Sequence, residues 1–214
     1  SVYSYKFDSH TSFDSQFTNQ LSSFIEQITA NADLRRKRVV LLDDGGSLLR
    51  TAKDYSFENV CGVEQTSSGY SRVKNDVSFP IVNVARSKTK LTVETPFIVE
   101  CFLENLENYL TDNRLSPKRG LILGGGPIGK EVQKQADFET YIFDTDQEKN
   151  TLYNTELHKA LIDFDIIIGA SGNTSLPEKD HKYLRKGTVL TSISSSDREF
   201  DAVHLRRKSA KTSN

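Results

Sequence analysis

The first part of the chain alternates between stretches with helical spacing and short apolar runs. A helix is predicted over residues 13–30 from the spacing of Phe13, Phe17, Leu21, Phe24, Ile25 and Ile28. Apolar runs at 39–42, 59–63 and 80–84 are predicted to be strands, the first of them buried, and a helical stretch through Leu48, Leu49 and Ala52 follows the first. Strands that alternate with helices indicate parallel βαβ units, because a parallel pair needs a crossover connection.

A longer amphipathic stretch begins at Thr95 and Pro96, which suit the N-cap and the first position of a helix. Its apolar residues form one wide face: Ile98, Val99, Phe102, Leu103, Leu106 and Leu110. We expect a helix over 95–112 that bridges two lobes. The polar connector at 111–119, which contains Pro117, is predicted to mark the domain boundary.

The alternation resumes after this helix. Four apolar runs, at 121–123, 140–143, 165–168 and 188–193, each end in small or acidic residues. In open α/β sheets the ligand crevice lies at those carboxyl ends. The predicted fold class is α/β with two lobes: a reduced, flavodoxin-like substrate-side lobe at 1–94 and a Rossmann-type doubly wound parallel sheet at 113–203, followed by a flexible tail at 204–214. We expect the ligand cleft between the lobes.

The composition and charge of the chain limit the kinds of molecule that it is expected to bind. The chain has 214 residues, 28 Lys and Arg against 29 Asp and Glu, and a formal net charge of -1. A nearly neutral chain excludes a broad surface for nucleic acid or anionic membrane, and no apolar run approaches the roughly 20 residues that span a bilayer. Cys61 and Cys101 are predicted to be small buried hydrophobes in a reducing cytoplasm, and the four scattered histidines indicate no metal site.

A glycine-rich turn carries the most specific signal. Gly124, Gly126 and Gly129 fit G-x-G-x-x-G directly after an apolar strand, and Asp144 ends the next strand 20 residues after the first glycine. The first glycine permits the tight turn, the second lets a diphosphate approach the backbone, and the third lets the helix pack on the sheet. Asp144 would accept hydrogen bonds from a ribose 2′-OH and repel a 2′-phosphate, which favours NAD over NADP. The alternative is a glycine turn that merely connects strand and helix, and the crossover of about ten residues before Thr140 is short for this motif.

Several stretches, in unbroken order, resemble the S-adenosylhomocysteine hydrolase family. The family's L-D-D-G-G, E-E-T-T-T-G and P-A-I-N-V…S-x-T-K are similar to L-D-D-G-G at 42–46, E-Q-T-S-S-G at 64–69, and P-I-V-N-V at 80–84 followed by S-K-T-K at 87–90. The glycine turn with Asp144 and Asp146 parallels the family's G-x-G-x-x-G and E-x-D. A weaker match runs from Asp165 through Gly172 to D-R-E-F-D at 197–201, against the family's D-V-E-I-D.

Members of that family oxidise the substrate 3′-OH with tightly held NAD, eliminate homocysteine and add water. The resemblance therefore implies an NAD-dependent enzyme with a small-molecule substrate, and catalytic roles for Lys90, Asp44 and Glu94. It implies cofactor contacts from both lobes: Thr66, Ser67, Ser68, Gly124, Gly126, Pro127, Ile128, Gly129, Asp144, Ser171, Gly172, Asn173 and Ser192. It also implies a homo-oligomer, because family members complete their cofactor sites across subunits.

Several positions depart from the family's pattern. Gln65 replaces a substrate-binding glutamate, Ser192 a nicotinamide-binding asparagine, and Ser195 a histidine. These departures favour an NAD-dependent enzyme with altered or lost hydrolase chemistry; the alternatives are a non-catalytic NAD-binding or sensing module and a partner subunit of a split enzyme. Two further alternatives stay open: Lys90 could be an ordinary solvated lysine, and residues 66–68 could simply cap a helix. A related 2-hydroxyacid dehydrogenase is disfavoured, because no histidine is placed to serve its chemistry.

Overall fold

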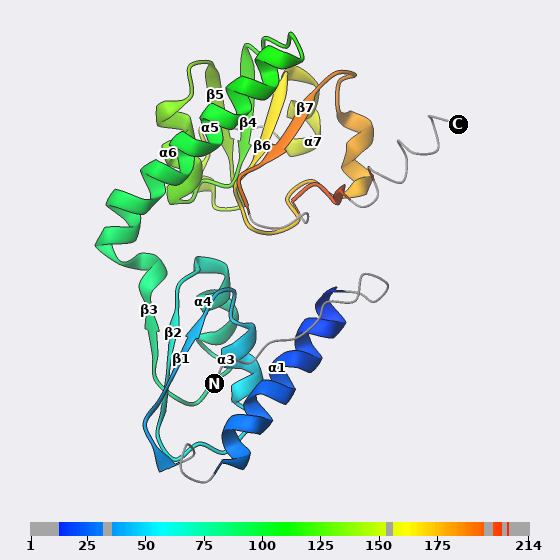
Figure 1. Ribbon diagram of the computed structural model, residues 1–214. Helices are drawn as coiled ribbons and strands as arrows, with labels where there is room; N and C mark the ends of the chain where they lie inside the picture. The colour runs from blue at the N-terminus through cyan, green and yellow to red at the C-terminus, as the bar shows by residue number, and fades with distance from the viewer. Residues whose placement is uncertain (1–12, 32–35, 153–155, 195–198, 203–204, 206–214) are drawn as a thin grey trace. The chain divides into compact units, whose positions relative to one another are not determined.

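The computed structural model describes residues 13–31, 36–152, 156–194, 199–202 and 205, and Figure 1 shows their elements. The chain forms two compact units, Ser1–Lys90 and Leu91–Asn214, which we call the first and the second unit. None of the helices in the described part of the chain combines the length and the apolar composition that a bilayer crossing requires.

The first unit contains a three-stranded parallel sheet with strand order β1-β2-β3. Its elements, in chain order, are α1 (Phe13–Ala30), β1 (Val39–Asp43), α3 (Ser47–Ala52), β2 (Val60–Glu64), α4 (Ser67–Val73) and β3 (Ile81–Asn83). The predicted helix over 13–30 and the three predicted strands are confirmed, with small shifts at the strand ends.

Helices cover one face of this first sheet. Leu41 of β1 packs in a cluster with Ile25 of α1, Leu49 of α3 and Val73 of α4. On the other face Val40, Leu42 and Val82 are exposed, and Val63 is half-buried. The prediction that the whole run 39–42 is buried is therefore wrong, because successive strand side chains point to opposite faces and the described helices pack on only one of them.

The second unit contains a four-stranded parallel sheet with strand order β5-β4-β6-β7. Its main elements are α5 (Thr95–Asp112), β4 (Arg119–Leu123), α6 (Pro127–Gln135), β5 (Glu139–Phe143), α7 (Leu157–Ala160), β6 (Ile166–Gly169) and β7 (Val189–Ser192). Core clusters cover both faces: Ile122 and Ile168 belong to one, Leu121 and Ile167 to the other. The predicted Rossmann-type doubly wound sheet is confirmed, and the strand order reverses between β4 and β6, where such folds place their ligand crevice.

Helix α5 is part of the second unit and not a separate bridge. Its Val99, Leu106 and Leu110 pack in the same cluster as Val132 of α6. A π-helical turn at Lys90–Glu94 precedes it, so Thr95 is a buried residue within a continuous helical stretch and not the predicted N-cap. The units divide after Lys90, whereas the predicted first lobe ended at residue 94.

Two local details complete the fold. The short crossover after the glycine turn accommodates α6, which has 9 residues. Cys61 is half-buried but Cys101 is exposed, so the prediction of a buried cysteine is wrong at Cys101. The buried face of α5 runs through Val99 and Leu106, and position 101 lies away from it.

Candidate functional site

The turn between β4 and α6 lies at the reversal point of the second sheet. Gly124 follows β4 with a φ of +115°, a conformation that side chains rarely adopt. Gly126 is the N-cap of α6, and Pro127 occupies the first turn of the helix. The first N–H groups of a helix have no intrahelical acceptor, so those of Ile128 and Gly129 face out of this helix end. The local geometry is that of an anion-binding turn.

The three glycines of the G-x-G-x-x-G motif, Gly124, Gly126 and Gly129, differ in what surrounds them. A Cβ on Gly129 would lie 1.9 Å from the carbonyl oxygen of Gly124, and a Cβ on Gly124 would lie 2.8 Å from the backbone of Ala170. These two glycines therefore permit the close packing of α6 and of the β6 loop. A Cβ on Gly126 would meet nothing within 4 Å, so the space over this residue is open. Packing does not require a glycine at 126, whereas close approach of a ligand to the backbone does.

Asp144 stands beside this turn, at the end of β5. Its Oδ2 accepts a hydrogen bond of 2.6 Å from the Gly125 amide, and its Oδ1 accepts one of 2.9 Å from the Asp146 amide. The side-chain oxygen of Asn150 accepts a hydrogen bond from the Asp144 amide and so fixes the backbone at Asp144. Each carboxylate oxygen can accept more than one hydrogen bond, so Asp144 is fixed in place and retains acceptor capacity. The predicted pairing of glycine turn and acid is thus present as one local arrangement.

The loop after β6 forms the other side of the reversal point. The amides of Ser171 and Gly172 donate to the Oε1 atom of Glu199, at 2.7 and 2.6 Å. The Asn173 amide donates to the Ser171 hydroxyl at 3.0 Å. The backbone donors of the three predicted cofactor residues are therefore already engaged within the protein. In the sequence Glu199 belongs only to the D-R-E-F-D match, and this role is not visible there because its partners are 24 to 28 residues distant along the chain.

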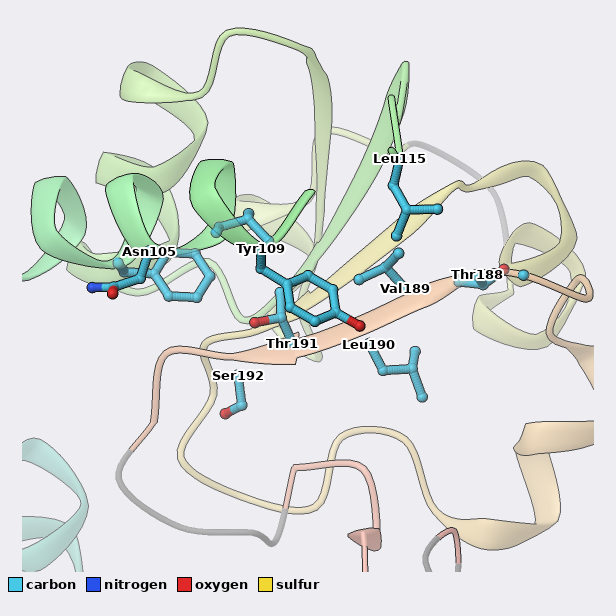
Figure 2. A pocket seen from close by; sticks show the side chains of 11 residues that line it. Asn105, Tyr109, Leu115, Thr188, Val189, Leu190, Thr191 and Ser192 are labelled. Atoms are coloured by element: carbon cyan, nitrogen blue, oxygen red, sulfur yellow. The ribbon is translucent and has the colours of Figure 1, made fainter. Parts of the chain in front are cut away.

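Ser192 ends β7 at one end of a groove of about 600 Å³. Figure 2 shows Tyr109 of α5 lying over β7, with Leu115 toward the start of the strand and Ser192 toward its end. The Ser192 hydroxyl lies 2.9 Å from that of Ser194 and accepts from the Ser194 amide. The glycine turn does not line this groove, so the groove and the turn are distinct features. Ser195, predicted as a departure from the family, lies outside the described residues.

In the first unit, two predicted catalytic residues are linked through Gln65. The side-chain NH₂ group of Gln65 donates to Oδ2 of Asp44 at 3.0 Å. The backbone carbonyl oxygen of Gln65 accepts from Nζ of Lys90 at 2.9 Å. The third predicted residue, Glu94, is exposed at the end of the π-helical turn and belongs to the second unit.

The hydroxyl-rich run at 66–68 caps α4. The Thr66 side chain accepts from the Gly69 amide at 3.0 Å and donates to Oε1 of Glu64 at 2.6 Å. Ser67 and Ser68 form the first turn of the helix. Thr66 therefore caps the helix as one interpretation of this run expects. A cofactor contact from Thr66, Ser67 and Ser68 stays a prediction.

Buried polar groups line the carboxyl edge of the first sheet, where Asp43, Glu64 and Asn83 are paired in register. Glu64 is 0% exposed, and its Oε1 accepts from Thr66 and from the Gly45 amide. Glu64 Oε2 and Asn83 Oδ1 are buried without a hydrogen-bond partner among the described residues. Burial raises the pKa of the Asp43 carboxyl, the charge of Glu64 adds to this, and the Leu49 amide opposes it. An acid at the last position of an apolar strand was the signal that could have identified Glu64.

Metal binding has no support from the described residues, in which no three His, Cys, Asp or Glu side chains gather as a metal would require. His158 and His181 belong to no such group, and His10 and His204 lie outside the described residues.

In a comparison with known protein families, no family model matches the chain. Two uncharacterised proteins from Mycobacterium tuberculosis, of strains CDC 1551 / Oshkosh and ATCC 25618 / H37Rv, are 40% identical over 206 residues. The match covers 93% of this chain and 40% of each relative, so the chain spans about two fifths of the length of the curated relatives it matches.

Among solved structures, the A chain of dipicolinate synthase from Bacillus subtilis matches with a TM-score of 0.42 and 13% identity, over 74% of this chain and 57% of that one. This likeness is too low to inform on ligand or activity. The assignment of a Rossmann-like fold rests on the sheet order of this chain itself.

Proposed function

We propose that the second unit binds a nicotinamide dinucleotide, with NAD preferred over NADP. The observation that carries the proposal is Gly126, which has no side chain although nothing within 4 Å would obstruct one. A diphosphate over this residue would meet the N–H groups of Ile128 and Gly129 at the positive end of α6. Pro127 would begin the helix in the required direction without offering a donor of its own.

Asp144 supplies the selectivity in this proposal. Its carboxylate is fixed by the amides of Gly125 and Asp146 beside the diphosphate position. Its remaining lone pairs would accept from the ribose hydroxyls of the adenosine half. A 2′-phosphate at the same place would meet a like charge, and close like charges disfavour binding.

The first unit supports an enzymatic role for the whole chain. Bound NAD would supply a hydride acceptor, as the resemblance to S-adenosylhomocysteine hydrolases implies. Lys90 and Asp44 are candidates to move protons and to hold substrate, and Gln65 positions both. Gln65 is an amide and cannot act as a base, which favours altered or lost hydrolase chemistry. A non-catalytic NAD-binding module is the second candidate, since the side-chain amide of Gln65 already donates a hydrogen bond to the Asp44 carboxylate.

Titration with NAD and NADP tests the binding proposal. We expect NAD to bind the wild-type chain more tightly than NADP, and Asp144→Ala to remove that preference. Asp137→Ala is the matched control, because Asp137 is an exposed acid that precedes β5 at the opposite end of the same strand. Equal binding of NAD and NADP by the wild type would remove Asp144 from its proposed role.

Incubation with adenosylhomocysteine and a thiol reagent tests the catalytic proposal separately. We expect any turnover to fall at least about a hundredfold in Lys90→Ala, the range for loss of a proton-transfer group. Lys88→Ala, an exposed lysine on the same segment, should leave it unchanged. Binding of NAD with no turnover under any condition would favour the non-catalytic module.

A further inference from the structure

Glu199 is a buried carboxylate at the edge of the proposed cofactor crevice, and it is only 1% exposed. Its Oε1 accepts from the amides of Ser171 and Gly172. Its Oε2 lies 3.0 Å from the hydroxyl of Ser171 and 2.6 Å from that of Ser175. Both oxygens of this carboxylate therefore have N–H or O–H partners, an arrangement that suits an acceptor-only anion.

The fold makes permanent room for this side chain. Gly169, the last residue of β6, is a glycine whose Cβ would lie 2.9 Å from the Cβ and Cγ of Glu199. The carbonyl oxygen of Glu199 also accepts from the amides of Ser175 and Leu176, at 3.1 and 2.9 Å. The next residue, Phe200, is buried in a core cluster of the second unit. Glu199 is thus held by backbone and side chain together, and a ligand would not displace it.

Among the described residues, the side chain of Glu199 is held by neutral amides and hydroxyls. Among the ion pairs between described residues, none includes Glu199. Amide and hydroxyl dipoles fix a carboxylate in place but leave its net charge on the site. In a partly buried site this charge acts on its surroundings over a longer range than it would in water.

The strand order indicates which half of a dinucleotide would lie near this charge. Asp144 ends β5, on one side of β4, and Glu199 holds the loop after β6, on the other side. With the adenosine ribose at Asp144 and the diphosphate at Gly126, the nicotinamide half extends toward β6. The oxidised nicotinamide ring carries a positive charge and the reduced ring is neutral.

We propose that Glu199 makes the second unit bind NAD⁺ more tightly than NADH. The proposal rests on the proposed function and adds to it a preference for one redox state. Glu199 is a positioning residue in this account: it orders the loop at 170–173 and places one negative charge on the nicotinamide side of the crevice.

Titration of the wild type and Glu199→Gln with NAD⁺, NADH and ADP-ribose tests this proposal. Glutamine keeps an oxygen for the two amides and an NH₂ group that can donate to the two serine hydroxyls, so the loop is retained while the charge is lost. We expect the variant to lose about five- to tenfold in affinity for NAD⁺ and less than about twofold for NADH and ADP-ribose. Glu199→Asp, which keeps the charge, should keep the preference for NAD⁺.

The outcomes separate the inference from the proposal on which it rests. An equal loss for all three ligands in Glu199→Gln would show a purely structural residue and overturn the inference. Tighter binding of NADH than of NAD⁺ by the wild type would overturn it even if the variant failed to fold. Wild-type protein that binds none of the three ligands would instead overturn the proposed function, and the inference with it.

Discussion

The two units use the same strand–turn–helix arrangement with opposite consequences for an anion. In each, a glycine is the third residue of the helix that follows a strand: Gly69 in α4 and Gly129 in α6. A Cβ on Gly69 would lie 2.4 Å from the carboxylate of Glu64, and one on Gly129 would lie 1.9 Å from the carbonyl of Gly124. A side-chain carboxylate lies against the helix glycine in the first turn, and a backbone carbonyl lies against it in the second.

This difference decides which turn can accept a phosphate. In the first unit, Glu64 already takes the amides of Gly45 and Thr66 and places its charge within the turn. In the second unit, β4 ends in Leu123 and glycines, and the space over Gly126 is open. The position of the acid therefore separates the two turns: Glu64 places its carboxylate within the first, whereas Asp144 lies at the Gly125 amide and leaves the space over Gly126 open for an anion.

Substitutions of the two helix glycines are expected to differ in their cost to stability. Gly129→Ala places a methyl group against a carbonyl of the main chain, which cannot move without breaking the turn, so it should cost about 3 kcal/mol of the stability of the second unit. Gly69→Ala meets a side chain, which has more freedom to shift, and should cost less. Denaturant unfolding followed by circular dichroism checks this. Equal losses in the two variants would contradict the distinction.

Much of the fold was predictable from the sequence because it depends on local patterns. Two strands are predicted with small boundary errors by the apolar runs at 121–123 and 165–168. The helix α6 is predicted in the same way by the turn at 124–129. The run at 39–42 looks the same in sequence but is covered on one face only, which depends on where the helices pack. Glu199 was not predictable as a loop anchor, because strand pairing brings together residues that are distant in the chain.

A matched pair of leucines tests the difference in sheet coverage. Leu121 of β4 is 0% exposed and Leu42 of β1 is 72% exposed. Leu121→Ala should therefore cost about 2–5 kcal/mol of unfolding free energy, and Leu42→Ala no more than about 0.5 kcal/mol. Urea denaturation of both variants provides the measurement. A loss above about 2 kcal/mol in Leu42→Ala would mean that the outer face of the first sheet is covered.

Two substitutions of Glu64 separate its hydrogen bonds from its charge. Glu64→Ala leaves two amides and one hydroxyl without their acceptor and should cost about 2 kcal/mol. Glu64→Gln keeps one oxygen for these donors and replaces the unpartnered Oε2 by an NH₂ group, so it should cost less than about 1 kcal/mol. Thermal unfolding compares them. Equal destabilisation would show that the charge itself is needed.

One acid in each unit should respond to pH with the opposite sign to the other. Burial raises the pKa of Asp43, so its contribution to stability is present below pH of about 4 and is lost as the pH rises through the folded value. The amides of Lys118 and Arg119, together with Arg185, lower the pKa of Asp165, so its contribution is present above pH of about 4 and is lost on acidification.

Denaturant unfolding of two asparagine variants between pH 3 and pH 6, a range of about one to two units around the ordinary aspartate pKa, measures this response. Relative to wild type, Asp43→Asn should gain stability as the pH rises and Asp165→Asn should lose it. The same trend in both variants would be inconsistent with the opposite pKa shifts.

Calorimetric titration of NAD into the wild type and Gly126→Ala tests the central claim most directly. The added methyl group meets open space and the backbone at 126 has an ordinary φ of −71°, so the variant should unfold like the wild type. We predict that the wild type binds NAD and that Gly126→Ala binds it at least about tenfold more weakly, because the methyl group occupies the approach of the diphosphate. Absence of NAD binding by the wild type, or unchanged affinity in Gly126→Ala, would contradict the account.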